Sequence, residues 1–185
     1  MKVLFTAGIV FTVFSSPLPK KTPVVIAYVG GYRGLVKTEM IEAEKITHIN
    51  YAFVNIRNGR AYLQNEGTDT VNFLNLIQLK KKNKNLKVLI SLGGWSWSEH
   101  FSDAALSDST RRLFAASAAG IVQRWNLDGI DIDWEYPGLK GEDNVFRAED
   151  RENFTLLLRA IRESLDALRG RKNKYQLTIA SGGFP

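Results

Sequence analysis

The segment that decides the fold of this chain reads Asp128-Gly129-Ile130-Asp131-Ile132-Asp133-Trp134-Glu135-Tyr136-Pro137. Its β-branched residues and its alternation of polar and apolar side chains are typical of a β-strand, which the proline would end. Because side chains on a strand point alternately to opposite faces, Asp131, Asp133 and Glu135 would lie on one face. The opposite face would be wholly apolar, and we expect it to be buried.

Three carboxyl groups on one face of such a strand are unfavourable unless they serve a purpose. Neighbours on that face would be about 6.6 Å apart at the backbone, close enough for their titrations to be coupled. Burying an unpaired carboxylate costs several kcal/mol, whereas hydrolysis of a glycosidic bond needs a carboxylic acid with a raised pKa. The cluster therefore indicates an active site. A solvated acidic strand edge is the alternative, and the apolar opposite face argues against it.

The rest of the chain alternates strand-like and helical patterns. Strand-like runs lie near residues 24–29, 46–54, 87–92, 129–134 and 177–181. Apolar residues at helical spacing cover residues 69–81, 108–125 and 154–168, and Arg169 and Gly170 would end the last helix. Strands that alternate with helices predict βαβ units and a parallel sheet. We expect an α/β fold of the (β/α)₈ TIM-barrel type with only about five of the eight βα units, since a full barrel usually needs about 250 residues.

Composition and charge set further limits. With 185 residues, of which 44% are hydrophobic, the chain can bury one substantial core, so a single domain is the default. Much of the net charge of +6 lies in the lysine-rich run of residues 80–87, which would decorate a helix C-terminus. Nucleic-acid binding is the alternative, but no stacking aromatic residues interleave with these lysines, so no nucleic-acid partner is expected. The absence of cysteine rules out disulfides and cysteine-bound metals.

The N-terminus predicts an exported protein. Lys2 precedes the uncharged residues 3–14, a stretch too short to span a bilayer and typical of the hydrophobic core of a signal peptide. We expect a signal peptide over residues 1–16 and a proline-containing spacer over residues 17–23. The protein would be secreted or periplasmic, with no membrane segment in its mature form. A buried N-terminal strand is the alternative, which the prolines of the spacer argue against.

The decapeptide resembles the DxxDxDxE signature of the family 18 glycoside hydrolases, the chitinase family. Asp128, Asp131, Asp133 and Glu135 fill the four acidic positions in order. Further segments resemble barrel strands of the family, one of them with its SxGG motif, and they are residues 25–28, 47–54, 87–95 and 177–180. The resemblance therefore implies that residues 24–185 form the N-terminal part of a family 18 catalytic domain. Three βα units would be missing, and with them a Met-x-Tyr-Asp element and a tryptophan of the later strands.

The resemblance also implies a mechanism. The protein would be a retaining hydrolase of β-1,4-linked N-acetylglucosamine that acts on chitin or its oligomers without a cofactor or metal. Glu135 would protonate the leaving oxygen, while the substrate's own acetamido oxygen attacks the anomeric carbon. Asp133 would orient the acetamido group, and Asp131 would hold Asp133 and share a proton with it. Substrate contacts would come from Tyr28, Phe53, Gly94, Trp95 and Tyr136.

Other interpretations stay open at this point. A non-catalytic sugar-binding relative is one, although the presence of Glu135 counts against it. An endo-β-N-acetylglucosaminidase that acts on glycans is another. A Mg²⁺ site would fit the Asp-x-Asp pattern, but the chain has no glycine-rich phosphate-binding loop. Phe53 is as consistent with a core aromatic as with a sugar contact. Asp128 would lie on the opposite face of the strand from the other three acids, and it is interpreted as a structural partner at the strand start.

Overall fold

The structure is a computed structural model that describes residues 23–168 and 174–182 of the chain. The predicted signal peptide over residues 1–16 lies outside the described residues, as does the predicted spacer except for its last residue. The predicted end of the last helix, at Arg169 and Gly170, lies outside them too. Among the described residues, no helix combines the length and the apolar character needed to cross a bilayer.

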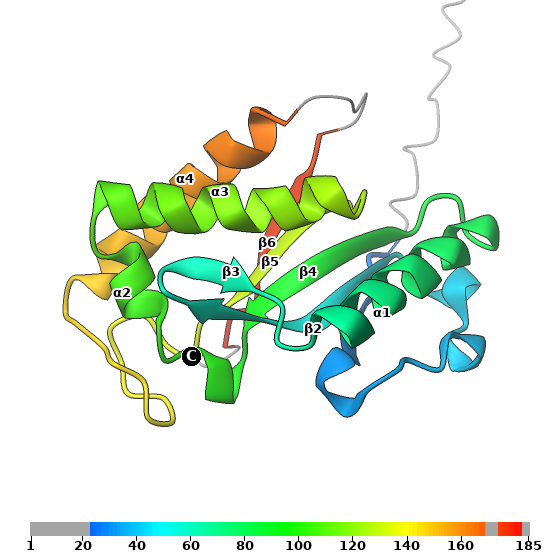
Figure 1. Ribbon diagram of the computed structural model, residues 1–185, viewed down its shortest axis with the longest axis horizontal. Helices are drawn as coiled ribbons and strands as arrows, with labels where there is room; N and C mark the ends of the chain where they lie inside the picture. Colours follow the sequence, from blue (N-terminus) through cyan, green and yellow to red (C-terminus); the bar gives the residue numbers. More distant parts are fainter. Residues whose placement is uncertain (1–22, 169–173, 183–185) are drawn as a thin grey trace, which may run out of the picture.

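The centre of the molecule is a twisted sheet of parallel strands with one antiparallel strand added (Figure 1). The strands are β1 (Ile26–Gly30), β2 (His48–Arg57), β3 (Arg60–Tyr62), β4 (Lys87–Gly93), β5 (Gly129–Asp133) and β6 (Gln176–Ile179). The parallel strands are ordered β1-β2-β4-β5-β6, so each one is added to the same edge of the sheet. The five predicted strands are thus present, with ends that differ from the prediction by a few residues. This order is that of consecutive βα units and confirms the predicted fold class.

Among the described residues, four α-helices and five short 3₁₀ segments connect the strands. They are α1 (Glu66–Gln78), α2 (Phe101–Ala105), α3 (Asp108–Arg124), α4 (Asp150–Asp166), η1 (Gly31–Arg33), η2 (Thr38–Met40), η3 (Ala43–Lys45), η4 (Leu79–Lys81) and η5 (Trp95–Trp97). Side chains cap two of the predicted helices, because Asn65 accepts a hydrogen bond from the Thr68 N–H and Ser107 forms a capping box with Thr110. The three helices that the apolar spacing predicts are all present as α1, α3 and α4.

The hairpin that contains β3 was not predicted. Asn58 and Gly59 connect β2 to β3 with positive φ angles of 52° and 69°. An Asn-Gly pair in this conformation is the preferred two-residue turn of a β-hairpin. The signal was therefore present in the sequence, but β3 has only three residues and shows no alternation of its own.

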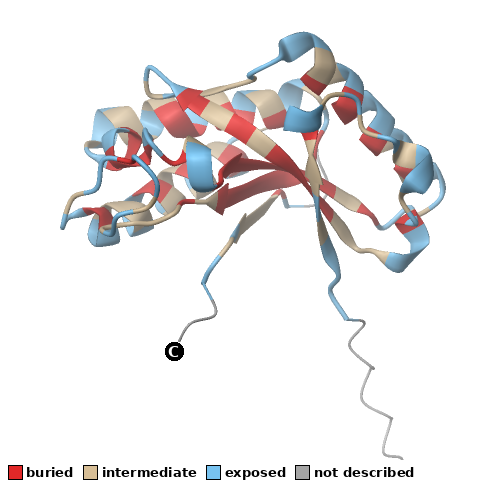
Figure 2. Ribbon diagram, turned by 90° about the horizontal axis from the view of Figure 1, so that it is seen from below, coloured by how far each residue is buried: buried red, intermediate tan, exposed pale blue. Residues whose placement is uncertain are grey.

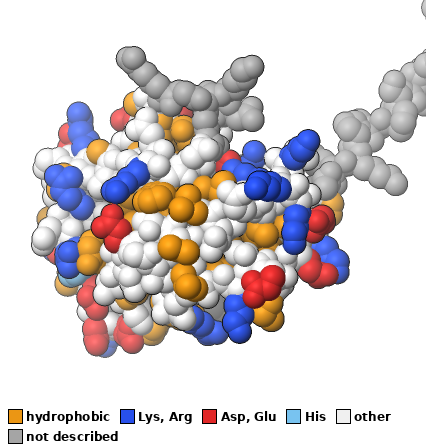
Figure 3. Space-filling model, turned by 45° about the vertical axis from the view of Figure 1, so that its right-hand side comes forward, with side chains coloured by type: hydrophobic (Ala, Val, Ile, Leu, Met, Phe, Trp, Pro, Cys, Tyr) orange, Lys and Arg blue, Asp and Glu red, His pale blue; other side chains and the backbone are white. Residues whose placement is uncertain are grey.

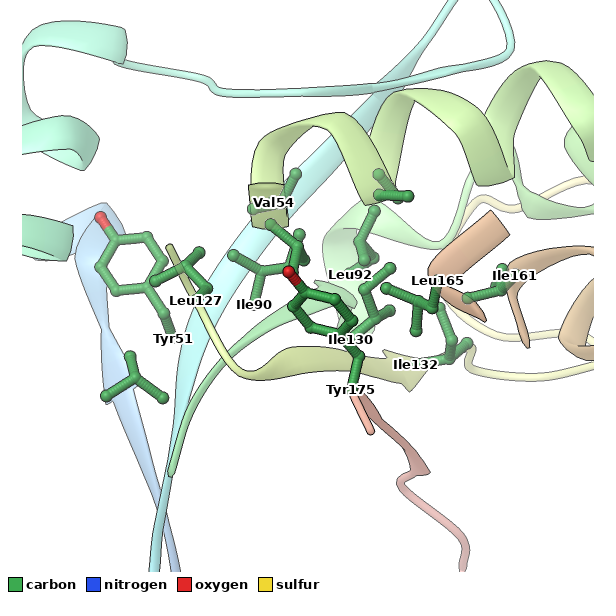
Figure 4. Packing of buried hydrophobic residues seen from close by; sticks show 14 of the residues in the cluster. Tyr51, Val54, Ile90, Leu92, Leu127, Ile130, Ile132, Ile161, Leu165 and Tyr175 are labelled. Carbon is green, nitrogen blue, oxygen red and sulfur yellow. The ribbon is translucent and has the colours of Figure 1, made fainter. Parts of the chain in front are cut away.

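The hydrophobic core lies between the sheet and the helices. In Figure 4, Ile90 and Leu92 of β4, Ile130 and Ile132 of β5 and Leu165 of α4 lie together in one hydrophobic cluster. All five side chains are buried, and each contributes about 1.5–3 kcal/mol by leaving water. Because these residues occupy alternate positions on their strands, the core takes one face of the sheet only. The residues that alternate with them, such as Ser91 and Asp131, lie on the other face of the sheet.

Trp134 anchors the chain just after β5. Its ring stacks on Phe101 of α2, with centroids 5.2 Å apart and planes at 14°, and meets the edge of Phe154 of α4 at 5.5 Å. Trp134 is 4% exposed and belongs to the same core as Ile130 and Ile132. The predicted burial of the apolar face of this segment is confirmed.

The face of the sheet opposite the helices is not enclosed. β1 and β6 are the two edge strands, and among the described residues each pairs with a single neighbour. Figure 2 shows that their residues are largely intermediate or exposed, whereas the central strands are largely buried. The described strands therefore form an open sheet and not a closed barrel.

The lysine-rich run has one member with a structural role. Lys80 of η4 donates a hydrogen bond to the Asp128 carboxylate, which also accepts the backbone N–H of Val88 at 2.7 Å. Asp128 is buried, so this contact joins η4 to the start of β5, as the interpretation of Asp128 as a structural partner expected. On the face in Figure 3, Lys and Arg lie among Asp and Glu around a central band of hydrophobic side chains and do not form one basic stripe.

Candidate active site

Asp131 is the buried centre of the open face. Its Oδ2 accepts hydrogen bonds from the Tyr28 hydroxyl and the Ser91 hydroxyl, each at 2.8 Å. Its Oδ1 accepts one from the Thr178 hydroxyl at 2.5 Å. The three donors come from β1, β4 and β6, so one carboxyl group connects four strands. Burying a carboxylate is costly unless it is hydrogen-bonded, and these hydroxyls meet that requirement.

Asp133 lies at the end of β5, on the same face as Asp131 and half-buried. Burial, followed by the charges of Glu135 and Asp131, raises the pKa of its carboxyl group to about 6. An acid with such a pKa is partly protonated near neutral pH. The predicted coupling of the three carboxyl groups is therefore seen at Asp133.

Glu135 lies two residues beyond the end of β5 and is partly exposed. The charge of Glu135 is the largest cause of a raised pKa of the neighbouring Tyr136 hydroxyl. The two side chains are therefore close together. Asp133 lies on the open face of the sheet and is close enough to Glu135 for the charge of Glu135 to act on it, whereas the oxygens of Asp131 are already occupied by hydrogen bonds.

An aromatic-lined cavity of about 350 Å³ lies in front of Asp133. Tyr28 and Phe53 line it together with Tyr32, a residue of η1 that was not predicted to belong to the site. A second cavity of about 320 Å³ adjoins it and shares Tyr32 and Phe53. Its other walls include Gly94, Trp95 and Trp97. The structure thus brings the acids and the predicted substrate contacts to one end of the sheet.

Gly94 makes room for the ring of Phe53. Its φ of 81° lies in the region that favours glycine, and a Cβ atom there would be 2.7 Å from the Phe53 ring. The neighbouring Gly93 would in the same way place a Cβ 2.2 Å from the carbonyl oxygen of Asp133. The two glycines therefore allow the end of β4 to approach both the aromatic wall and the acidic strand.

Trp95 and Tyr136 stand at the rim of this region. Their ring centroids are 6.5 Å apart at 69°, and Trp95 is 49% exposed. An exposed aromatic pair beside a cavity is suited to bind a flat apolar surface such as the face of a sugar ring. Among the described residues, no three His, Asp or Glu side chains are grouped so that they could hold a metal ion.

Three residues of this site were not among the predicted site residues: Ser91, which was noted only as part of the SxGG motif, Thr178 and Tyr32. Ser91 lies within the predicted third strand and Thr178 within the fifth. Both are register partners of Asp131 in the parallel sheet, so their side chains lie on the same face as its carboxyl group. Their spacing therefore contained a signal. Tyr32 follows a Gly-Gly pair after the first strand and carries no signal of its own, because its position depends on the 3₁₀ turn of η1.

Comparison with known proteins identifies relatives of this chain. Residues 24–184 match the model of the family described as glycosyl hydrolases family 18. Chitinase A1 of Niallia circulans is 39% identical, over 77% of this chain and 27% of its own length. Chitinase 1 of Aphanocladium album is 38% identical, over 78% of this chain and 37% of its own length.

Solved structures agree with these matches. The chitinase domain of the spore coat protein CotE from Clostridium difficile superposes with a TM-score of 0.75 at 35% identity, over 89% of this chain and 44% of that one. A family 18 N-acetylglucosaminidase from Paenibacillus barengoltzii gives a TM-score of 0.74 at 40% identity, over 84% and 44%.

The chain thus spans between 27% and 44% of the length of these relatives. The matched region nevertheless covers almost all of the described residues and includes the whole acidic segment. Sequence, strand order and the position of the acids agree, and the chain belongs to the glycosyl hydrolases of family 18 and forms an N-terminal part of their (β/α)₈ domain.

Proposed function

We propose that the protein is a chitinase, a hydrolase of β-1,4-linked N-acetylglucosamine that retains the anomeric configuration. The observation that carries this proposal is the pair Asp133 and Glu135 beside an aromatic-lined cavity. Asp133 is half-buried with a pKa raised to about 6, and Glu135 lies close enough for its charge to contribute to that rise. Two acids in different environments are what acid catalysis on a sugar requires. The names of the two curated relatives, both chitinases, support the same substrate class.

In this proposal Glu135 is the general acid. It transfers a proton to the glycosidic oxygen while the bond from that oxygen to the anomeric carbon breaks. The acetamido oxygen of the same sugar forms the new bond to the anomeric carbon and gives an oxazolinium ion. Water then opens this ring from the other side and loses its proton to the Glu135 carboxylate. Two inversions at one carbon give net retention.

Asp133 is the residue proposed to support the acetamido group. A carboxyl group that is partly protonated can either donate a hydrogen bond or carry the charge that stabilises the oxazolinium ion. Asp131 is proposed to hold Asp133 and to share a proton with it, and hydrogen bonds from Tyr28, Ser91 and Thr178 keep Asp131 in place. After burial and the charge of Glu135, the charge of Asp131 is the third cause of the raised pKa of Asp133.

The substrate would be bound by Tyr28, Phe53, Gly94, Trp95 and Tyr136. Sugar rings have flat apolar C–H faces that fit aromatic rings and displace water from them. Phe53 lies between the two cavities and contacts both, which favours a role in binding over a purely structural one. Gly94 contributes through the space that it leaves for the Phe53 ring.

The test is the variant Glu135→Gln in the full-length protein, with a fluorogenic chitobioside as substrate. Glutamine has the same shape but cannot donate the proton, so turnover should fall by about 10²-fold or more while binding of chitin oligomers is largely kept. Unchanged turnover would remove Glu135 from the mechanism. Binding without hydrolysis in the unsubstituted protein would favour the sugar-binding alternative. Activity that survives exhaustive chelation would remove the metal alternative in the same assay.

A second substrate range is supported by one comparison. The Paenibacillus barengoltzii relative, at 40% identity, is described as an N-acetylglucosaminidase. We therefore propose to follow the products from chitin oligomers of increasing length. Release of single N-acetylglucosamine units would favour that activity, and internal cleavage would favour a chitinase. Release of glycans from a glycoprotein would instead favour an endo-β-N-acetylglucosaminidase.

Export is proposed on the strength of the N-terminal sequence. Residues 1–16 carry a hydrophobic stretch behind a single lysine, as a signal peptide does. Sequencing the N-terminus of the mature protein tests this: a start after residue 16 is expected, and a retained Met1 would contradict it.

A further inference from the structure

The peptide that carries the catalytic acid is held by side chains and not by the sheet. β5 ends at Asp133, so Glu135 has no partner in a strand ladder. Its backbone N–H donates instead to the Ser98 hydroxyl at 2.9 Å, and its carbonyl oxygen accepts from the Asn144 side-chain amide at 3.3 Å. Both partners are buried, Ser98 at 0% exposure and Asn144 at 7%. The backbone N–H and the backbone C=O of Glu135 are therefore each hydrogen-bonded to one buried side chain.

Ser98 connects the acid to the preceding strand. Its hydroxyl donates to the carbonyl oxygen of Gly94 at 2.9 Å, and the carbonyl oxygen of Asp133 lies within reach at 3.3 Å. The Gly94 N–H donates to that same Asp133 oxygen at 2.8 Å. The backbone at both acids is thus fixed to the loop that follows β4. The Ser98 hydroxyl therefore contacts the backbone of Asp133, before Trp134, and the backbone of Glu135, after it.

Asn144 performs the corresponding role on the other side of the peptide. Its Oδ1 accepts the N–H of Gly141 at 2.7 Å while its amide binds Glu135. Gly141 packs so closely that a Cβ atom there would lie 2.1 Å from the Glu135 carbonyl oxygen. The segment after the acid therefore folds back onto the acid's own peptide and is held there by Asn144.

We infer that Ser98 and Asn144 are positioning residues of the active site, which set where the Glu135 carboxyl group stands relative to the substrate. The inference rests on the proposed function of Glu135 as the acid. A buried N–H or C=O group needs a partner, so removing either side chain would let the Glu135 peptide turn to find another. A displacement of about 1 Å at a reacting group can cost about 10²-fold in rate. Neither Ser98 nor Asn144 lines the two cavities, so the contacts that side chains make there with a substrate should be largely kept.

The experiment compares Ser98→Ala and Asn144→Asp with a matched control in the full-length protein. Asn144→Asp keeps the size and the oxygen that binds Gly141 but removes the donor to Glu135. Ser117→Ala is the control, because the Ser117 hydroxyl accepts the Ala61 N–H at 2.8 Å and donates to the Phe114 carbonyl at 2.7 Å, far from the acids. The readouts are kcat, KM and hydrogen exchange at the Glu135 amide.

For both test variants we expect kcat on a fluorogenic chitobioside to fall by about 10- to 100-fold with KM changed by no more than about two-fold. In Ser98→Ala the Glu135 amide should exchange at least about ten-fold faster, since it has lost its acceptor. Ser98→Thr, which keeps the hydroxyl, should recover most of kcat. Ser117→Ala should change neither kcat nor exchange at Glu135.

Different results separate this inference from the proposed function. Full kcat in folded Ser98→Ala and Asn144→Asp proteins would overturn the inference, and so would an equal loss in Ser117→Ala. If the unsubstituted protein and Glu135→Gln hydrolyse the chitobioside equally, the proposed function fails and with it the catalytic meaning of these contacts. Exchange at Glu135 still decides whether Ser98 holds the peptide: an unchanged rate in Ser98→Ala contradicts it, and a faster rate supports it.

Discussion

Replacing Asp133 by asparagine should stabilise the protein above pH 6 while it removes the proposed acetamido partner. The pKa of Asp133 is raised from 3.8 to about 6, first by burial and then by the charges of Glu135 and Asp131. A carboxyl group with a raised native pKa binds protons more tightly in the folded than in the unfolded state. Its favourable contribution is therefore complete below pH 3.8 and is lost as the pH rises through about 6.

The magnitude follows from the shift. One pKa unit corresponds to about 1.4 kcal/mol, so a shift of roughly two units sets an upper limit of about 3 kcal/mol. Asp133 is only half-buried, and solvent screening reduces such a value considerably, so we expect about 1 kcal/mol. For a domain of this size that difference corresponds to a change of roughly 2–4 °C in Tm. Asparagine has the same shape and no charge, so it should escape the penalty at every pH.

The assay is a series of thermal melts of Asp133→Asn and the unsubstituted protein between pH 4 and pH 8. The Tm values should nearly coincide at about pH 4 and separate by roughly 2–4 °C at about pH 7.5, with the variant higher. Asp143→Asn serves as a control for the loss of one negative charge, because Asp143 is exposed. A variant that is less stable at pH 7.5, or a difference that does not change with pH, would refute the reasoning.

Three further predictions concern packing. Gly94→Ala should raise KM for chitin oligomers several-fold, measured by steady-state kinetics, because its methyl group would meet the Phe53 ring at 2.7 Å. Trp134→Ala should lower the free energy of unfolding by about 3–5 kcal/mol in urea titrations, since the ring packs between Phe101 and Phe154. Residues 17–185 expressed alone should aggregate and hydrolyse little chitobioside, because β1 and β6 each have one unpaired edge among the described residues. A monodisperse, fully active chain would contradict this last prediction.

The sheet was predictable because its strands have one face in the core. The residues of β4 and β5 that face the helices are uniformly apolar, and their spacing is visible in the sequence without knowledge of any contact. The hairpin of β3 and the 3₁₀ turns were not predicted, because they are short and held by local turns. Lys80 was read only as part of a charged run, since its contact with Asp128 joins residues 48 positions apart.

The acids of the site were predictable for the same reason, but only as far as the strand extends. Alternation places Asp131 and Asp133 on the open face, and both belong to β5. Glu135 was assigned to that face by continuing the alternation, yet β5 has ended before it. Beyond a strand end, the direction of a side chain is no longer set by pleating. The prediction for Glu135 therefore extended the strand pattern past the segment where that pattern applies.

What sets the position of Glu135 instead is a pair of contacts that no local pattern reveals. Ser98 lies 37 residues before the acid and Asn144 lies nine residues after it, both in loops. A serine in a loop and an asparagine in a glycine-containing turn are common, so neither residue stands out in the sequence. Their importance appears only when the Glu135 N–H and C=O groups are traced to their partners, as every buried backbone group must be. The acid can thus be recognised from the strand that leads to it, whereas its alignment is determined by the loops that surround it.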